Sequence, residues 1–286
     1  MKNSVIRKIV GLLLLVAIST SVYGRRVVNG FNQDKVNYYV VGLGKVEVIQ
    51  PFGLLYGKNV VIPSSVTHDG KTYEVVGIGD NAFNSQWVES IVIPPSVKYI
   101  GFAAFLHSEL RSIHFPTNID TVPHHCFYDC QYLTNVRLYD NVKHIGSSAF
   151  YYCVNLPWID IPGNVDVVDT LAFAECTRLE HIYLHEGTRV IAHNAFFHCR
   201  SLAEIELPST IEFIGQGAFA ECEKLQKVKI HAQLPPMLNA GKKVERVFNK
   251  ISKTAVLYVP KGSLQAYRSA PQWMDFTEIV EFEEEK

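Results

Sequence analysis

The sequence predicts a mainly β repeat solenoid, built from stacked coils of 22 or 23 residues. A phenylalanine recurs at this spacing, a cysteine follows it by three residues in most copies, and a short segment of alternating polarity comes next. The phenylalanine occupies Phe83, Phe105, Phe127, Phe150, Phe173, Phe196 and Phe219. A unit of this length cannot bury its own apolar side, whereas stacked units bury a continuous core.

Each coil contains one predicted strand and one predicted return segment. The strand follows the pattern Leu-x-x-Ile-x-Leu, as in LEHIYL (179–184), whose alternation is typical of a strand with one buried face. A proline often comes next, as at Pro94 and Pro162, and would end the strand. The motif YIG, HIG or FIG predicts a turn, and we expect the alanine–phenylalanine segment after it to form a short return segment, either one helical turn or a plain turn.

The two ends of the chain depart from the repeat and are predicted to cap it, because an open solenoid end exposes apolar core. Residues 25–80 are expected to form a strand-rich N-terminal cap that precedes the repeats at 81–233. Residues 234–281 are expected to form a last, distended coil, with Phe248 in the phenylalanine position, and a C-terminal cap. The acidic tail occupies residues 282–286.

Residues 1–24 predict a secretory signal peptide. Basic residues precede an apolar run at 9–18, and small and polar residues then lead to Gly24. The alternative is a membrane-spanning helix, which this run is too short to form. We therefore expect an exported monomer, located in the periplasm, at the cell surface or outside the cell, with no integral membrane segment in the mature chain.

Six cysteines raise the question of disulfides in an exported chain. Five of them, from Cys130 to Cys222, recur every 23 residues, so their side chains should point the same way from successive coils. Equivalent Cβ atoms would then lie about 4.8 Å apart, whereas a disulfide requires about 3.8 Å and converging side chains. We therefore predict buried free thiols that donate hydrogen bonds to backbone carbonyls. Cys126 stands in an alanine position and is also expected in the core.

Few residues are available for chemistry. The net charge of -1 gives no reason to expect nucleic acid as a partner. The segment HHCFYDC (124–130) offers His124, His125, Cys126 and Cys130 as zinc ligands, but the repeat already accounts for the cysteines. Glycine-flanked serines, phosphate-binding loops and HExxH are not present. We expect no cofactor, no metal and no enzymatic activity.

The repeat motifs resemble one known family. The pattern Leu-x-x-Ile-x-Leu, followed by Ile-Pro-x-x-Val-x-x-Ile-Gly-x-x-Ala-Phe-x-x-Cys, is similar to that of the BspA-like leucine-rich repeat family over residues 88–230. Residues 60–83 and 255–281 resemble its terminal segments, while Ser108 stands where a cysteine is common. The resemblance implies a right-handed leucine-rich-repeat superhelix with a non-enzymatic binding role at or beyond the cell envelope of a Bacteroides-type anaerobe.

The outward positions of the strands are the predicted contact surface, because they vary from coil to coil while the inward positions do not. The candidate ligand-binding residues are Trp158, Tyr183, His181, Arg137, Asp160 and Glu206. Aromatic residues are common at interface hot spots, although a solvated strand face also needs a polar mixture. We expect protein recognition or adhesion, with host matrix or cell-surface proteins as ligands. The alternative is an envelope glycan-binding or accessory module of a polysaccharide-capture system.

Overall fold

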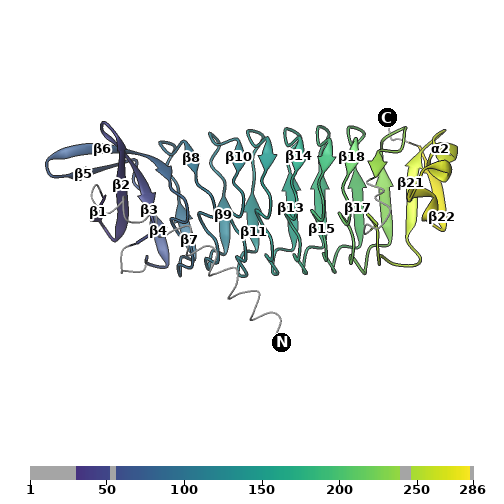
Figure 1. The fold of residues 1–286 in the computed structure, drawn as a ribbon, viewed down its shortest axis with the longest axis horizontal. Helices are drawn as coiled ribbons and strands as arrows, with labels where there is room; N and C mark the ends of the chain where they lie inside the picture. Colours follow the sequence, from purple (N-terminus) through teal and green to yellow (C-terminus); the bar gives the residue numbers. More distant parts are fainter. Residues whose placement is uncertain (1–29, 52–55, 239–245, 284–286) are drawn as a thin grey trace.

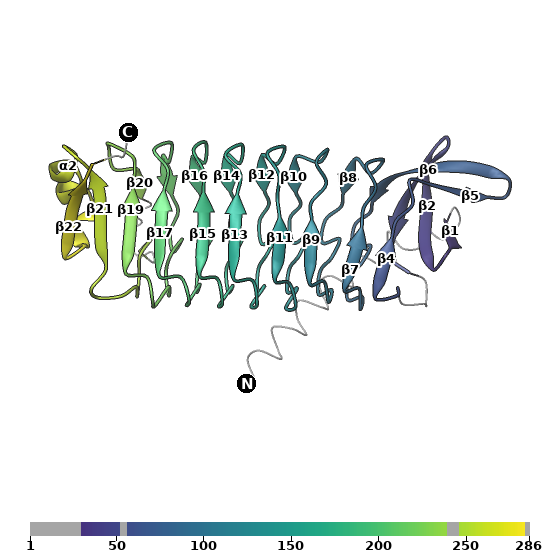
Figure 2. The ribbon, with the colours of Figure 1, turned by 180° about the vertical axis from the view of Figure 1, so that it is seen from behind.

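The computed structural model describes residues 30–51, 56–238 and 246–283. The predicted signal peptide, at 1–24, lies outside the described residues. Figures 1 and 2 show coils stacked side by side along one axis, with the N-terminal strands at one end and α2 (Leu264–Ser269) and β22 (Glu278–Phe282) at the other. The predicted mainly β solenoid is confirmed.

The strands predicted from the Leu-x-x-Ile-x-Leu pattern, with one further strand before them and two after them, form the first ladder, which we call the face ladder. Its members are β4 (Asn59–Val61), β7 (Ser90–Val92), β9 (Ser112–His114), β11 (Asn135–Arg137), β13 (Trp158–Ile161), β15 (His181–Leu184), β17 (Glu204–Leu207), β19 (Lys227–Ile230), β21 (Val256–Pro260) and β22. Neighbours that bond to each other run parallel and in register, as β13 and β15 do through Ile159 and Ile182. The inward residues of these strands are buried or partly buried, and the outward residues are exposed on most of them, as strand alternation requires.

A second ladder was not predicted. Its members are β8 (Tyr99–Ile100), β10 (Thr121–Val122), β12 (His144–Ile145), β14 (Val167–Val168), β16 (Val190–Ile191), β18 (Phe213–Ile214) and β20 (Met237–Leu238). The strands from β10 to β20 form one parallel sheet of six. The YIG-type motifs are predicted as turns from the sequence, because two residues are too few for strand alternation to be visible.

The return segment around each phenylalanine is a turn, and the expectation of one helical turn there is wrong. Two residues in each such segment have left-handed backbone, for example Leu171 (φ 59°) and Glu175 (φ 64°) on either side of Phe173. Left-handed residues interrupt a right-handed helix. Every second backbone N–H bonds to the next coil instead, as the N–H of Phe173 does to the carbonyl of Ala195 at 2.8 Å. The segment is therefore a wide turn held by its neighbours.

The phenylalanines form a continuous column in the core. Neighbouring rings from Phe83 to Phe219 stack with centroids 5.0 to 5.5 Å apart. Phe248 continues the column 5.6 Å beyond Phe219, so the residue predicted for the last phenylalanine position occupies it. Every coil thus contributes one ring to the same apolar stack.

Five of the cysteines, from Cys130 to Cys222, form a second column, and all six cysteines are free and buried. Five thiols donate to the phenylalanine carbonyl of the preceding coil at 3.1 to 3.3 Å, as Cys176 does to Phe150. Burial raises the pKa of the Cys176 thiol to about 12. Ser108, in the cysteine position of an earlier coil, lies 3.4 Å from the Cys130 sulfur. The predicted buried thiols and their carbonyl partners are confirmed.

Both ends of the stack are covered. At the N-terminal end lies a sheet of β1 (Gly30–Gln33), β2 (Val36–Gly42), β3 (Lys45–Ile49), β6 (Lys71–Ile78) and β5 (Ser65–His68), in that order. At the C-terminal end, α2 and the short 3-10 helix η1 (Trp273–Asp275) bring Trp273 to 5.4 Å from the Phe248 ring. None of the helices among the described residues has the length and hydrophobicity needed to cross a membrane.

Candidate functional site

The six predicted binding residues all lie on outward positions of the face ladder and are exposed. Arg137 is on β11, Trp158 and Asp160 on β13, His181 and Tyr183 on β15, and Glu206 on β17. Because each residue alternates with a buried one, the rigid core below determines the direction of its side chain. We call these six residues the face strip.

The centre of the face strip is a group of four side chains on two paired strands. Trp158 is in register with His181, and Asp160 with Tyr183. The His181 and Tyr183 rings lie 6.3 Å apart and nearly parallel. Trp158 is 36% exposed and Tyr183 is 52% exposed. The structure therefore brings the predicted aromatic anchors together.

A shallow hollow of about 210 Å³ adjoins this group on its C-terminal side. Its walls are His181, Tyr183, His185, Glu204, Glu206, Lys227, Lys229 and the strand residues between them. The hollow spans the junction between β15 and β17, which belong to separate hydrogen-bonded sheets. The face strip is thus concave at one point.

The charges around this hollow are largely paired. Glu206 lies 2.6 Å from both Lys229 Nζ and His231 Nε2. Partial burial raises the pKa of Glu206, but the hydrogen bonds from Lys229 and His231 outweigh it, so the net pKa is lowered. Asp160 pairs with His185 at 2.7 Å. Since acids and bases neutralise one another here, the aromatic rings are the main feature that the surface offers to a ligand.

Arg137 is separated from this group by its own contact. Its guanidinium lies 4.9 Å from the centroid of the Tyr139 ring on the same segment, a cation–π arrangement. Arg137 therefore extends the face strip toward the N-terminal end without joining the Asp160 ion pair.

The family follows from the repeats themselves. The model of the BspA type leucine-rich repeat region matches residues 76–191 and 169–240, with six copies. The chain belongs to this family.

Solved structures share the fold of this BspA-type repeat protein. One is a leucine-rich cell surface protein from Faecalibacterium prausnitzii A2-165, 22% identical, with a TM-score of 0.64 over 81% of this chain and 70% of the other. Another is a leucine-rich repeat protein from Bacteroides ovatus ATCC 8483, 20% identical, with a TM-score of 0.53 over 88% of this chain and 76% of the other. None of the curated proteins compared with the chain matches it.

The BspA-type repeats carry a second apolar spot on the face ladder that sequence reasoning missed. Val61 and Val92 are in register on β4 and β7, and both are exposed. Trp87, in the segment just before β7, is 59% exposed and thus more exposed than Trp158. The strand pattern does not include Trp87, although a tryptophan directly before the buried Val88 is a visible signal in the sequence.

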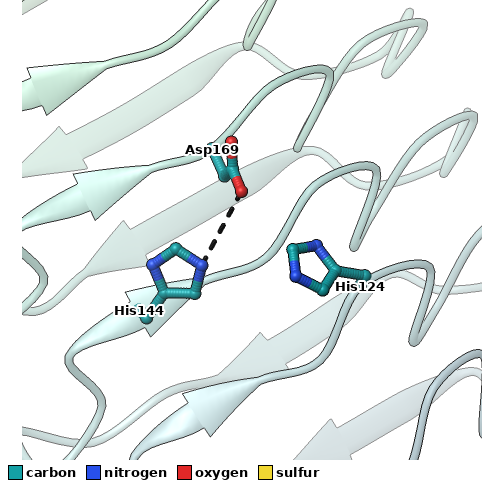
Figure 3. A group of neighbouring side chains, drawn as sticks. All are labelled: His124, His144 and Asp169. Carbon is teal, nitrogen blue, oxygen red and sulfur yellow. Dashed lines mark ion pairs between the residues drawn. The ribbon is translucent and has the colours of Figure 1, made fainter.

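Three side chains beside the second ladder of the BspA-type repeats approach one another closely enough to suggest a metal site (Figure 3). His124, His144 and Asp169 each place a ligand atom within 4.8 Å of the other two. However, Nδ1 of His124 accepts a hydrogen bond from the Ser147 backbone N–H at 2.8 Å. A neutral imidazole that accepts at Nδ1 carries its proton on Nε2, whereas a metal-bound histidine donates through its second nitrogen. His124 therefore bonds to the backbone of the next coil, as the equivalent His193 also does. Only His144 and Asp169 remain as potential metal ligands in this group.

The residues of the HHCFYDC segment point to different places. Cys126 and Cys130 are fully buried in the core, and the Cys130 thiol donates to the Phe105 carbonyl at 3.1 Å. The His125 ring packs on Tyr128 instead, with centroids 5.6 Å apart. These four side chains do not converge on one position.

Proposed function

We propose that this protein is an exported, non-enzymatic binding protein that recognises a protein ligand through the face strip. The observation that carries the proposal is the cluster of Trp158, His181 and Tyr183 on two in-register strands beside a hollow. Exposed tryptophan and tyrosine are the residue types that contribute most at interfaces. The stacked core holds the backbones of their two strands in place before binding, so little backbone entropy is lost when a partner docks.

The ligand class proposed is a host matrix or cell-surface protein, since the paired charges leave no strong field to select a highly charged polymer. Membership of a leucine-rich repeat family supports a protein-interaction role. Export supports access to such ligands and is itself part of the proposal, to be checked by surface labelling of intact cells.

The test is a double substitution, Trp158→Ala with Tyr183→Ala, in the mature protein. Binding to immobilised collagen, fibronectin and laminin should weaken at least tenfold for whichever ligand the wild type binds, while the melting curve stays unchanged. Trp87→Ala is the matched control, because it removes an equally large exposed ring elsewhere. Equal binding by the double variant and the wild type would remove the face strip as the interaction surface.

A further inference from the structure

A larger hollow, of about 430 Å³, lies on the turns that carry the phenylalanines, away from the face strip. It is lined by His125, Tyr128, Ser148, Tyr151, Leu171, Glu175, Asn194 and Phe197. These residues come from four successive coils, so the hollow exists only in the stacked protein. Its volume falls in the range of about 300–1,000 Å³ that is typical of small-molecule sites.

The aromatic walls of this hollow come from the residue that directly follows a core phenylalanine. Tyr128 and Tyr151 occupy that position in two successive coils, and their rings stack 4.7 Å apart with an angle of 15° between them. The next coil has Ala174 there, and the one after it has Phe197. Ala174 is fully buried and adds no surface. The aromatic series is therefore interrupted for one coil between Tyr151 and Phe197, whose backbones are two coil steps, or about 10 Å, apart.

Polar groups lie among these rings. Oδ1 of Asn194 and Nδ1 of His125 are buried and have no hydrogen-bond partner among the described residues. Glu175 is held by His198, with 2.5 Å between Oε2 and Nδ1. Burial lowers the pKa of His125, so its ring is neutral at pH 7 and can donate at one nitrogen and accept at the other.

The aromatic rings and polar groups of this hollow together favour one class of ligand over others. His125, Glu175 and Asn194 are each partly exposed at the hollow. A purely apolar occupant would cover their polar atoms with hydrocarbon, which costs free energy for each atom that loses its water without gaining a hydrogen bond. An anionic occupant would meet the Glu175 carboxylate. A pyranose ring has C–H faces that pack on aromatic rings and hydroxyls around its edge that donate and accept hydrogen bonds. It therefore matches both parts of the lining.

We propose that this hollow binds a neutral sugar residue of a polysaccharide, with Tyr151 and Phe197 packing on the ring and Ser148, Glu175 and Asn194 bonding its hydroxyls. On the N-terminal side, Phe102 lies 5.1 Å from the His125 ring and is itself exposed. The apolar surface thus continues beyond the hollow, and a longer oligosaccharide should bind more tightly than a single sugar.

The experiment is binding of the mature protein to an array of neutral oligosaccharides that contain glucose, mannose, galactose, xylose and N-acetylglucosamine, followed by calorimetry on the best ligand. The informative variant is Ala174→Tyr, which restores the missing ring and fills the hollow. The Tyr128–Tyr151 pair shows that the fold accepts aromatic rings on consecutive coils at this position. Tyr151→Ala removes a wall instead, and the face-strip double variant is the matched control.

The proposal expects wild-type binding, at least a tenfold loss in both Ala174→Tyr and Tyr151→Ala, and no change in the control. Circular dichroism and thermal melting establish that each variant is folded, and either folded variant is sufficient for the test. A wild-type protein that binds none of the neutral sugars overturns the proposal, as does binding that a folded Ala174→Tyr variant retains. Loss of binding in the face-strip variant alone would assign the sugar to the other surface.

Discussion

The inward and outward sides of the face-ladder strands differ in how much their residues vary from coil to coil. On β13, β15, β17 and β19 the inward residues are Ile159, Ile182, Ile205 and Val228, all buried. One position further along, the outward residues are Asp160, Tyr183, Glu206 and Lys229. The inward side needs one shape repeated in every coil, because each side chain packs on its own equivalent. The outward side has no such demand, so its residues are free to specify a ligand.

Among substitutions that test this difference, the largest loss of stability is expected for one on the inward side, in the core. Phe173→Ala removes one ring from a stack whose neighbours lie 5.0 and 5.4 Å away. The cavity should lower the free energy of unfolding by about 3–5 kcal/mol, measured by urea denaturation. Tyr183→Ala, on the outward side, should change it by about 0.5 kcal/mol or less. Similar losses for the two variants would contradict the difference between the two sides.

A smaller effect is expected at the thiols. Cys176→Ala removes the hydrogen bond to the Phe150 carbonyl and should lower the free energy of unfolding by about 1–2 kcal/mol. In the folded protein the pKa of this thiol is raised to about 12, whereas in the unfolded chain it is about 8.5.

The neutral Cys176 thiol therefore makes its full contribution to folding stability below about pH 8.5, and this contribution is lost as the pH rises toward 12. Unfolding curves from pH 7 to 11 should show this decline, with a shallower slope in Cys176→Ala. Iodoacetamide should leave the native thiols unmodified until the protein unfolds. Rapid alkylation of the native protein at pH 8 would refute the buried column.

The smallest effect is expected on the exposed side. Glu206→Gln weakens the pairs with Lys229 and His231, but the carboxylate is 57% exposed and solvent screens it. The expected loss of stability is below about 1 kcal/mol and should shrink further in 0.5 M salt. A loss of stability as large as that of Cys176→Ala would show that ion pairs on the exposed face also contribute substantially to the stability of the fold.

Much of the fold could be predicted from the sequence, because a strict period together with strand alternation fixes which residues point inward. The column of phenylalanines, the free thiols and the position of Phe248 all follow from that reasoning. The second ladder did not, since Val167 and Val168 alone show no period. The wide turns did not either, because Leu171 and Glu175 are not residues whose left-handed backbone can be recognised from their type.

The candidate sites, like the fold, could be predicted from the sequence only in part. Alternation places Trp158 and Tyr183 on the outer face, but the hollow beside them depends on how β15 meets β17. The hollow over the turns depends on Ala174 lying between two coils that carry rings. That feature becomes visible only when residues one coil apart are compared as spatial neighbours, and the wide turns that align them were not predicted.

The strands of both ladders lie across the long axis of the molecule (Figure 1), which has a mechanical consequence. A protein tethered at one end and loaded at the other is pulled along that axis, so the hydrogen bonds between coils are peeled apart one pair at a time. Each coil that detaches would release roughly 75 Å of extended chain. The rod would therefore give way in successive steps at modest force, lengthening under flow while the coils that remain stacked keep their surfaces intact.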